Sequence, residues 1–224
     1  MNKLILTLAA FSLMAVTACG AGGKSAAEAP ADAPAEKAAG KVSAAKPGGL
    51  VEGKAPAGFK RYAMDNDYFS CDVPADWFLK RDQENDEEYD IYEIELVAPR
   101  SEKTPTAIFV SYHSKNSDDF ADYKDFIERN SKNIAGETKN KRESYEPVKK
   151  TKLAKREAFE LSRERLVFLH PESKSDESVQ LKEKHYVLPA KEGFYVLHFT
   201  AAKTLFAQYS KVFEKVAGSF TGKY

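Results

Sequence analysis

The sequence predicts a domain of the α+β class in which most strands are antiparallel. Several short segments after Phe59 alternate apolar and polar side chains, which is the period-two pattern of half-buried strands. Near the carboxyl end, apolar side chains recur at three- and four-residue steps from Leu205 to Val216, which is typical of an amphipathic helix. Residues 59–224 therefore form a single globular domain of mixed composition, without an internal repeat.

Strands are predicted where the alternation is clearest. After the first of them, Pro74 stops the pattern before Trp77. The stretch 185–199 is a hairpin around a loop at 190–193, and its second arm is apolar on both faces, so we expect that arm to be a central strand. The predicted strands cover 69–73, 92–96, 108–112, 185–188, 194–199 and two segments within 153–169 that turn near 155–156.

A second helix is expected to begin with Ser117 as its N-cap and to end near Gly136, because apolar residues between them follow helical spacing. The strongly acidic run from Asp82 to Asp90 reads as a solvated loop or hairpin tip. The basic run 139–156 reads as a charged hairpin. Alternatively, it is a patch for an anionic partner, with Lys149, Lys150 and Lys152 as candidate contacts.

The amino terminus reads as a secretory signal. One positive charge at Lys3 precedes an apolar run from Leu4 to Val16. About a dozen apolar residues reach only ~20 Å as a helix, short of the ~30 Å hydrocarbon core of a bilayer. We therefore expect residues 1–18 to be removed rather than to span the membrane.

The residues Val16-Thr17-Ala18-Cys19 resemble a bacterial lipobox. This resemblance implies cleavage between Ala18 and Cys19, with fatty acyl chains on Cys19 as the membrane anchor. Several chains on one residue give stable anchoring. Gly20, in place of an Asp, favours the outer membrane of a bacterial envelope by the same resemblance. The alternative is a plain secreted protein with an incidental cysteine.

Residues 19–58 are predicted to be a disordered linker that starts at the lipidated Cys19. They are almost wholly Ala, Pro, Gly, Lys and Glu, and so lack the large apolar side chains whose burial offsets the entropy of ordering. A chain of this length has a random-coil span of ~35 Å. The linker would hold the folded domain near the membrane but not on it.

Composition narrows the functional classes. The chain has 224 residues with 34 basic and 34 acidic side chains, and this balance argues against a nucleic-acid partner. There are two cysteines, so a lipidated Cys19 leaves Cys71 without a partner and excludes a disulfide framework. No nucleophile elbow, phosphate-binding loop or dinucleotide fingerprint occurs, so we predict neither an enzyme nor a cofactor.

The four histidines lack the short spacings of zinc motifs, and no metal site is predicted from them. One geometric alternative remains, because the hairpin would place His185 across from His198. Such a pair could bind a metal, but the sequence offers no clear third ligand. Trp77 is expected to close one end of the core; the alternative is that it stacks on a ligand.

The run Phe69-Ser70-Cys71-Asp72-Val73-Pro74-Ala75-Asp76-Trp77 and the final Ala217-Gly218-Ser219-Phe220 resemble the PsbP/Mog1-like family. The resemblance covers most of residues 62–220. It implies an α-β-α sandwich around a central antiparallel sheet, and roles in binding or assembly more than in catalysis.

The function expected from these observations is that of a membrane-tethered envelope lipoprotein, a non-catalytic interaction or assembly module. Its partners would be membrane lipid, through the acyl chains, and an envelope protein or anionic polymer. Two alternatives are a lipoprotein that binds a small ligand in an aromatic pocket near Trp77, and a hydrolase whose site is not recognised.

Overall fold

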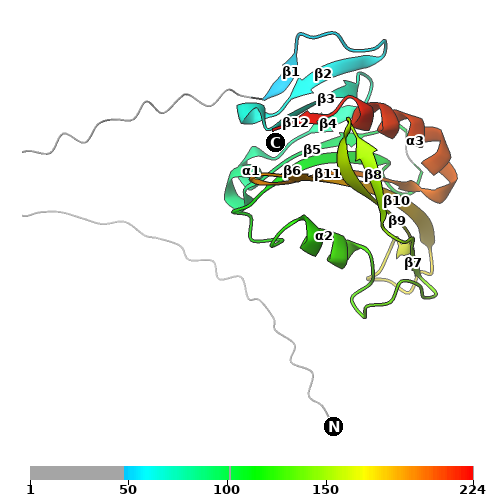
Figure 1. Ribbon diagram of the computed structural model, residues 1–224. Helices are drawn as coiled ribbons and strands as arrows, with labels where there is room; N and C mark the ends of the chain where they lie inside the picture. The colour runs from blue at the N-terminus through cyan, green and yellow to red at the C-terminus, as the bar shows by residue number, and fades with distance from the viewer. Residues whose placement is uncertain (1–47, 101, 224) are drawn as a thin grey trace, which may run out of the picture. The chain divides into compact units, whose positions relative to one another are not determined.

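The computed structural model describes residues 48–100 and 102–223, which fold into two antiparallel sheets and three α-helices (Figure 1). The smaller sheet has the order β1-β2-β3-β12. Its strands are β1 (Gly49–Val51), β2 (Phe59–Ala63), β3 (Phe69–Pro74) and β12 (Thr221–Gly222), and the 3-10 turn η1 (Asp65–Asp67) joins β2 to β3. The α+β class is thereby confirmed.

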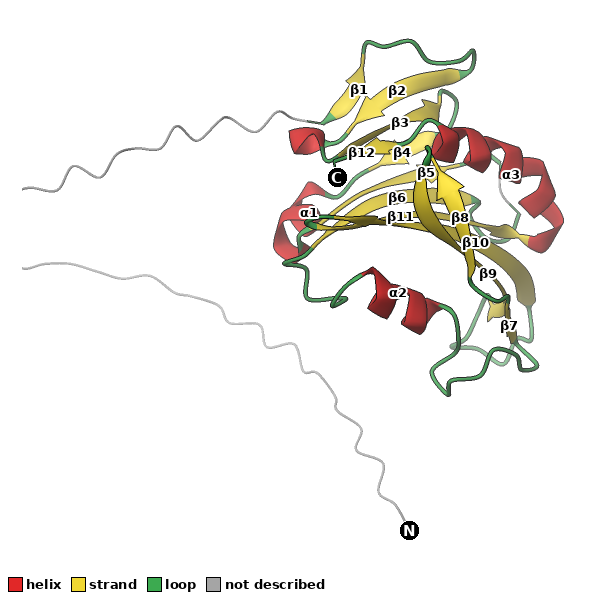
Figure 2. Ribbon diagram, in the orientation of Figure 1, coloured by secondary structure: helices red, strands yellow, loops and turns green. Residues whose placement is uncertain are grey.

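The larger sheet has the order β4-β5-β6-β11-β10-β9-β7, and β8 also pairs with β9 (Figure 2). Every one of these pairings is antiparallel. The strands are β4 (Phe78–Lys80), β5 (Ile91–Val97), β6 (Ala107–Ser114), β7 (Glu143–Tyr145), β8 (Lys149–Leu153), β9 (Arg156–Phe168), β10 (Ser178–Ala190) and β11 (Gly193–Ala202). The arm that was expected to be central, β11, lies between β6 and β10 as predicted.

Helices lie against both faces of the larger sheet. On one face, Phe213 of α3 (Lys203–Gly218) stacks on Tyr186 of β10 and Phe199 of β11. On the other, Phe126 of α2 (Tyr123–Asn130) packs in a smaller cluster with Val187 of the same strand β10. The smaller sheet shares the α3 side (Figure 1). The structure therefore has two sheets where a single central one was expected.

The main core fills the space between the two sheets and α3. Side chains of β11 that point to this side, such as Tyr195, Leu197 and Phe199, are completely buried. The single hydroxyl proton of Tyr195 is shared between the backbone oxygens of Tyr68 at 2.9 Å and Lys223 at 2.7 Å. This side chain therefore ties the larger sheet to the residues just before β3 and just after β12 in the smaller sheet.

The turn between β10 and β11 fixes the position of that hairpin on the sheet. Gly193 has a φ of +148°, and a Cβ at this position would lie 2.0 Å from the backbone oxygen of His113 on β6. Only glycine allows this close approach. Within the hairpin, Ala190 pairs with Gly193 across the turn, and the same register pairs Tyr186 with Leu197 and His185 with His198.

Cys71 lies in β3 and is fully buried in the main core as a free thiol. Desolvation is the main cause that raises its pKa to about 12. A neutral thiol in such a place acts as a small apolar side chain.

Two predicted segments differ from the structure. The acidic run 82–90 is not a loop, because it contains the helix α1 (Gln83–Tyr89). The helix α2 begins after Asp122, whose carboxylate accepts hydrogen bonds from two backbone N–H groups, and not after Ser117. It ends at Asn130, well before Gly136, and Ile134 is fully exposed.

The ordered structure also starts earlier than Phe59. Residues 49–51, within the predicted linker, form β1 and pair with 61–63 of β2. The signal and lipobox residues, and the rest of the linker up to 47, lie outside the described residues. Within the described range, none of the helices has the length and apolar character needed to cross a bilayer.

Replacing Phe213 by alanine should lower the free energy of unfolding by about 3–5 kcal/mol, because it leaves a cavity where α3 meets the sheet. Urea unfolding followed by circular dichroism measures this loss. Phe78→Ala is the matched control: Phe78 is 64% exposed, so its loss should cost within about 0.5 kcal/mol. Equal losses in the two variants would contradict this assignment of the core.

Candidate functional site

The α2 face of the larger sheet carries a buried polar cluster beside the apolar contacts of α2. Glu183 and His185 lie two residues apart on β10 and so point to the same face, and His198 of β11 stands directly opposite His185. The two imidazole rings stack with centroids 4.0 Å apart and planes 5° apart. We call these three residues, with Arg163 and Arg165 of β9, the β10–β11 cluster.

Two arginines hold the carboxylate of this cluster. Arg163 Nε donates to Glu183 Oε2 at 2.5 Å, and Arg165 Nε donates to Glu183 Oε1 at 2.5 Å. Glu183 has no exposed side-chain surface, whereas Arg165 is 41% exposed. A carboxylate buried in this way is stable only with such partners, since removal of one partner from a buried ion pair costs about 3–5 kcal/mol.

The protonation states in the cluster follow from its surroundings. Burial alone would raise the pKa of Glu183, but the nearby His198 and the guanidinium charges more than offset it and hold that pKa well below its usual range. Burial is the main cause that lowers the pKa of His185 well below its ordinary value. At neutral pH the cluster therefore contains an ionised carboxylate beside a neutral imidazole.

A second feature is a cleft of about 550 Å³ beside α1, which we call the α1 cleft. Five of its lining residues are acidic and two are basic. The lining consists of Lys80, Arg81, Asp82, Asp86, Tyr89, Ile91, Glu93, Glu95 and Asp119.

Arg81 fixes the wall of this cleft. It donates to Asp86 Oδ2 of α1 at 2.7 Å and also pairs with Asp65 in η1. The other oxygen of Asp86 accepts the backbone N–H of Glu93 at 2.9 Å. These contacts hold α1 against β5, which explains how so acidic a segment forms a helix without an apolar stripe.

Glu93 is the unusual residue of the α1 cleft. Its carboxylate makes no hydrogen bond or ion pair with any residue in the described part of the chain, whereas its neighbour Glu95 pairs with Lys80 at 3.2 Å. Desolvation, with smaller contributions from Asp86 and Glu95, raises the pKa of Glu93 to about 7. A strongly perturbed carboxyl in a cleft is typical of functional sites.

Trp77, the first of the candidates from the sequence, lies in the main core. Trp77 is 9% exposed and packs edge-on against Tyr209 of α3 with ring centroids 5.6 Å apart, which fits its expected role at the end of the core. It lines neither the α1 cleft nor the second cleft, which lies between α2, β7 and β9. Among the described residues, Trp77 therefore packs in the core and belongs to neither of these two clefts.

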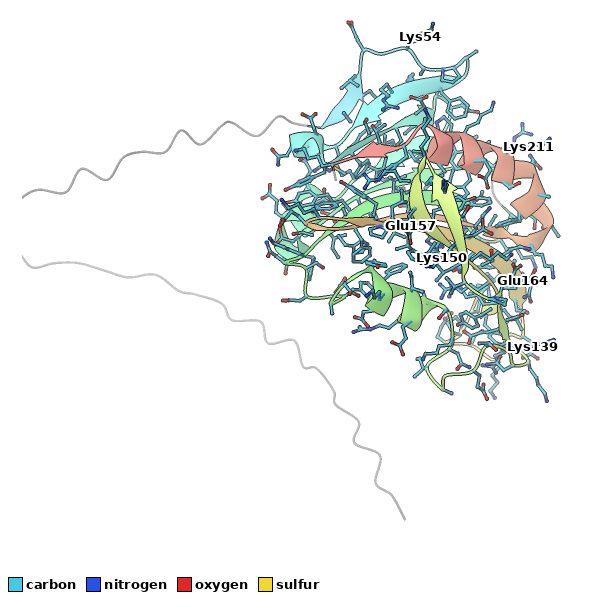
Figure 3. The ribbon with its side chains drawn as sticks, viewed as in Figure 1. Lys54, Lys139, Lys150, Glu157, Glu164 and Lys211 are labelled. Carbon is cyan, nitrogen blue, oxygen red and sulfur yellow. The ribbon has the colours of Figure 1, made fainter. Side chains whose placement is uncertain are left out.

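The basic candidates Lys149, Lys150 and Lys152 are exposed on β8, but acidic residues accompany them. Lys149 pairs with Glu146 at 3.0 Å, and Lys152 lies opposite Glu157 across the hairpin. Figure 3 shows Lys150 and Glu157 on the two arms of this hairpin. The turn between the arms falls at Ala154–Lys155, next to its predicted place. The predicted lipidation and cleavage residues, Cys19 and Ala18, lie outside the described residues.

Sequence reasoning missed Glu183 and Glu93. The signal for Glu183 was present, because a residue two before His185 on a strand must share its face. No sequence signal marks Glu93, which belongs to the alternating strand 92–96. Its raised pKa depends on α1, and that helix was not predicted.

Comparison with known proteins adds only distant similarity. No protein-family model matches the sequence, and no curated protein matches it. Several solved structures are similar, among them the following three. Cyanobacterial PsbP (CyanoP) from Synechocystis has a TM-score of 0.48 and 14% identity, over 78% of this chain and 98% of its own. A protein from Bacteroides thetaiotaomicron has a TM-score of 0.45 and 12% identity, and the match covers 75% of this chain and 49% of that protein.

LpqN, which is involved in cell envelope biogenesis of Mycobacterium tuberculosis, has a TM-score of 0.42 and 14% identity, over 70% of this chain and 83% of its own. CyanoP is a protein of the kind that the sequence resemblance names. At these identities and TM-scores, neither family membership nor function follows for this chain. The PsbP/Mog1-like assignment stays a prediction.

Replacing Glu93 by glutamine should change how stability depends on pH. The carboxyl has a pKa of about 7 in the folded protein and an ordinary value of 4.5, so the folded state binds more protons between these values and the wild type loses stability as the pH rises through them. Glutamine removes this loss. We expect Glu93→Gln to gain about 3 kcal/mol relative to wild type between pH 4.5 and pH 8.

Urea unfolding at both pH values tests this expectation. A parallel pH dependence in the two proteins would contradict the raised pKa. Glu157→Gln, an exposed glutamate on β9, controls for the loss of one negative charge.

Proposed function

We propose that this protein is a lipid-anchored protein of the bacterial envelope that acts as a non-catalytic interaction module, with the α1 cleft as its binding surface. The observation that carries the proposal is Glu93, a desolvated carboxylate that lines a cleft without a partner among the described residues. An unpaired charge of this kind destabilises the free protein. A ligand that supplied a positive group would remove that cost.

The charge of the cleft indicates the kind of partner. With five acidic and two basic lining residues, it favours a cationic group over an anionic polymer. Both basic residues are already paired, Lys80 with Glu95 and Arg81 with Asp86. An envelope protein that presents lysine or arginine side chains fits this surface.

One contact in the structure favours the hydrolase alternative. Ser111 Oγ lies 3.1 Å from His113 Nε2, which is the contact between a nucleophile and its base. However, both residues are buried and His113 Nδ1 has no partner in the described part of the chain, so no acid orients the imidazole. Burial lowers the pKa of His113 to about 4, which makes it a poor base at neutral pH. The interaction module is therefore preferred.

The anchor is the lipobox cysteine, and the low-complexity linker after it gives the domain reach from an outer membrane. Replacing Cys19 by serine should abolish labelling with a radioactive fatty acid and move the protein from the membrane to the soluble fraction. Cys71→Ser is the matched control, because the buried thiol of Cys71 cannot serve as an anchor. A wild-type protein that takes up no lipid label would contradict the anchor.

Capture from solubilised envelopes tests the binding surface. Wild-type protein should recover a specific envelope protein, and Glu93→Gln should reduce this recovery several-fold. Recovery should also fall as salt is raised, since the contact is between opposite charges. The exposed control Glu157→Gln should bind like wild type. Equal recovery by Glu93→Gln and wild type would contradict the assignment of the α1 cleft.

A further inference from the structure

The β10–β11 cluster is separate from the α1 cleft, and the proposed function does not use it. It holds a carboxylate and two imidazoles whose ligand atoms all lie within 4.8 Å of one another. Glu183 is fully buried and His185 is 4% exposed. Within the described residues, His185 Nδ1 is a buried nitrogen without a hydrogen-bond partner, and His198 Nε2 faces Glu183 Oε2 at 3.5 Å. Buried ring nitrogens normally have partners, so the unpartnered Nδ1 of His185 points to a ligand.

We propose that Glu183, His185 and His198 bind a divalent transition-metal ion such as Zn²⁺. Two histidines and one carboxylate are a known ligand set for zinc and for other first-row metals. Zinc–ligand bonds of about 2.0–2.2 Å place the donors of a tetrahedral site about 3.3–3.6 Å apart. His198 Nε2 and Glu183 Oε2 are 3.5 Å apart, close to this separation.

The third ligand needs a small adjustment. The rings of His185 and His198 are nearly parallel, so their nitrogens point side by side rather than to one point. His198 is 22% exposed, whereas His185 is buried, so His198 is the ring that can turn to bring its nitrogen onto a shared ion. On its outer side His198 stacks only on Phe109, with centroids 5.4 Å apart.

The two arginines decide which metal fits. Each guanidinium uses one lone-pair site of Glu183, and a carboxylate has about four, so its oxygens can still bind an ion. Hydrogen bonds to a ligating carboxylate are common around metals. The positive charges of Arg163 and Arg165 nevertheless weaken the attraction for any cation. Ca²⁺ and Mg²⁺, which depend on carboxylate charge, should therefore bind poorly compared with an ion that imidazole nitrogens prefer.

The full chain is purified in mild detergent and stripped of metal. Calorimetric titration with ZnCl₂ then tests the proposal. We expect one ion bound per chain, with no comparable uptake of Ca²⁺ or Mg²⁺. His198→Phe keeps an aromatic ring between Phe109 and His185 but removes the nitrogen, and it should weaken Zn²⁺ binding roughly tenfold or more, as should Glu183→Gln. His170→Phe, which removes a 52% exposed histidine outside the cluster, should bind like wild type.

The outcomes are distinct. No stoichiometric Zn²⁺ uptake by the wild type, or equal affinity in wild type and His198→Phe, overturns the proposal. Because variants of buried residues may not fold, X-ray absorption of the zinc-loaded wild type gives an independent measurement. A coordination shell with two imidazole nitrogens supports the site. A shell without imidazole nitrogens contradicts it. The probe is the metal alone, so neither lipidation nor a protein partner affects the result.

Discussion

The register of the β10–β11 hairpin is the constraint on which the rest of the structure depends. Ala190 and Gly193 pair at the tight turn, which sets how the two arms align, and Gly193 also fits against the backbone of His113, which places the hairpin beside β6. Successive side chains on a strand face opposite sides, so a slip of one residue would move Tyr195 and Phe199 out of the main core and His198 into it. The core, the tie made by Tyr195 and the polar cluster are thus consequences of one turn.

The two faces of the larger sheet differ in the side chains that they bury. The α3 face is sealed by large apolar side chains such as Phe199 and Phe213. The α2 face instead buries charges and imidazoles, among them Glu183 and His185, which cost free energy that apolar residues would not. Polar groups with incomplete partners are the expected sign of a surface kept for binding.

Most strands were predictable because alternation in sequence directly reports half-burial, as in 69–73 and 92–96. The helix α1 was not, since its stability comes from ion pairs of Arg81 and not from an apolar stripe. The start of α2 was misplaced because Ser117 and Asp122 are both good capping residues, and only the tertiary packing of Phe126 selects between them. The pairing of His185 with His198 followed from the hairpin pattern, whereas the raised pKa of Glu93 depends on contacts distant in sequence.

The burial of Cys71 has a consequence for handling the protein. The sequence contains two cysteines, and this one is sealed inside the domain as a protonated thiol. A thiol-specific reagent added to the folded chain therefore has a single cysteine, Cys19, left to react with. The proposed acyl anchor would block the sulfur of Cys19, so the fraction of molecules that react would count how many chains lack a lipid, without a radioactive label or a membrane preparation.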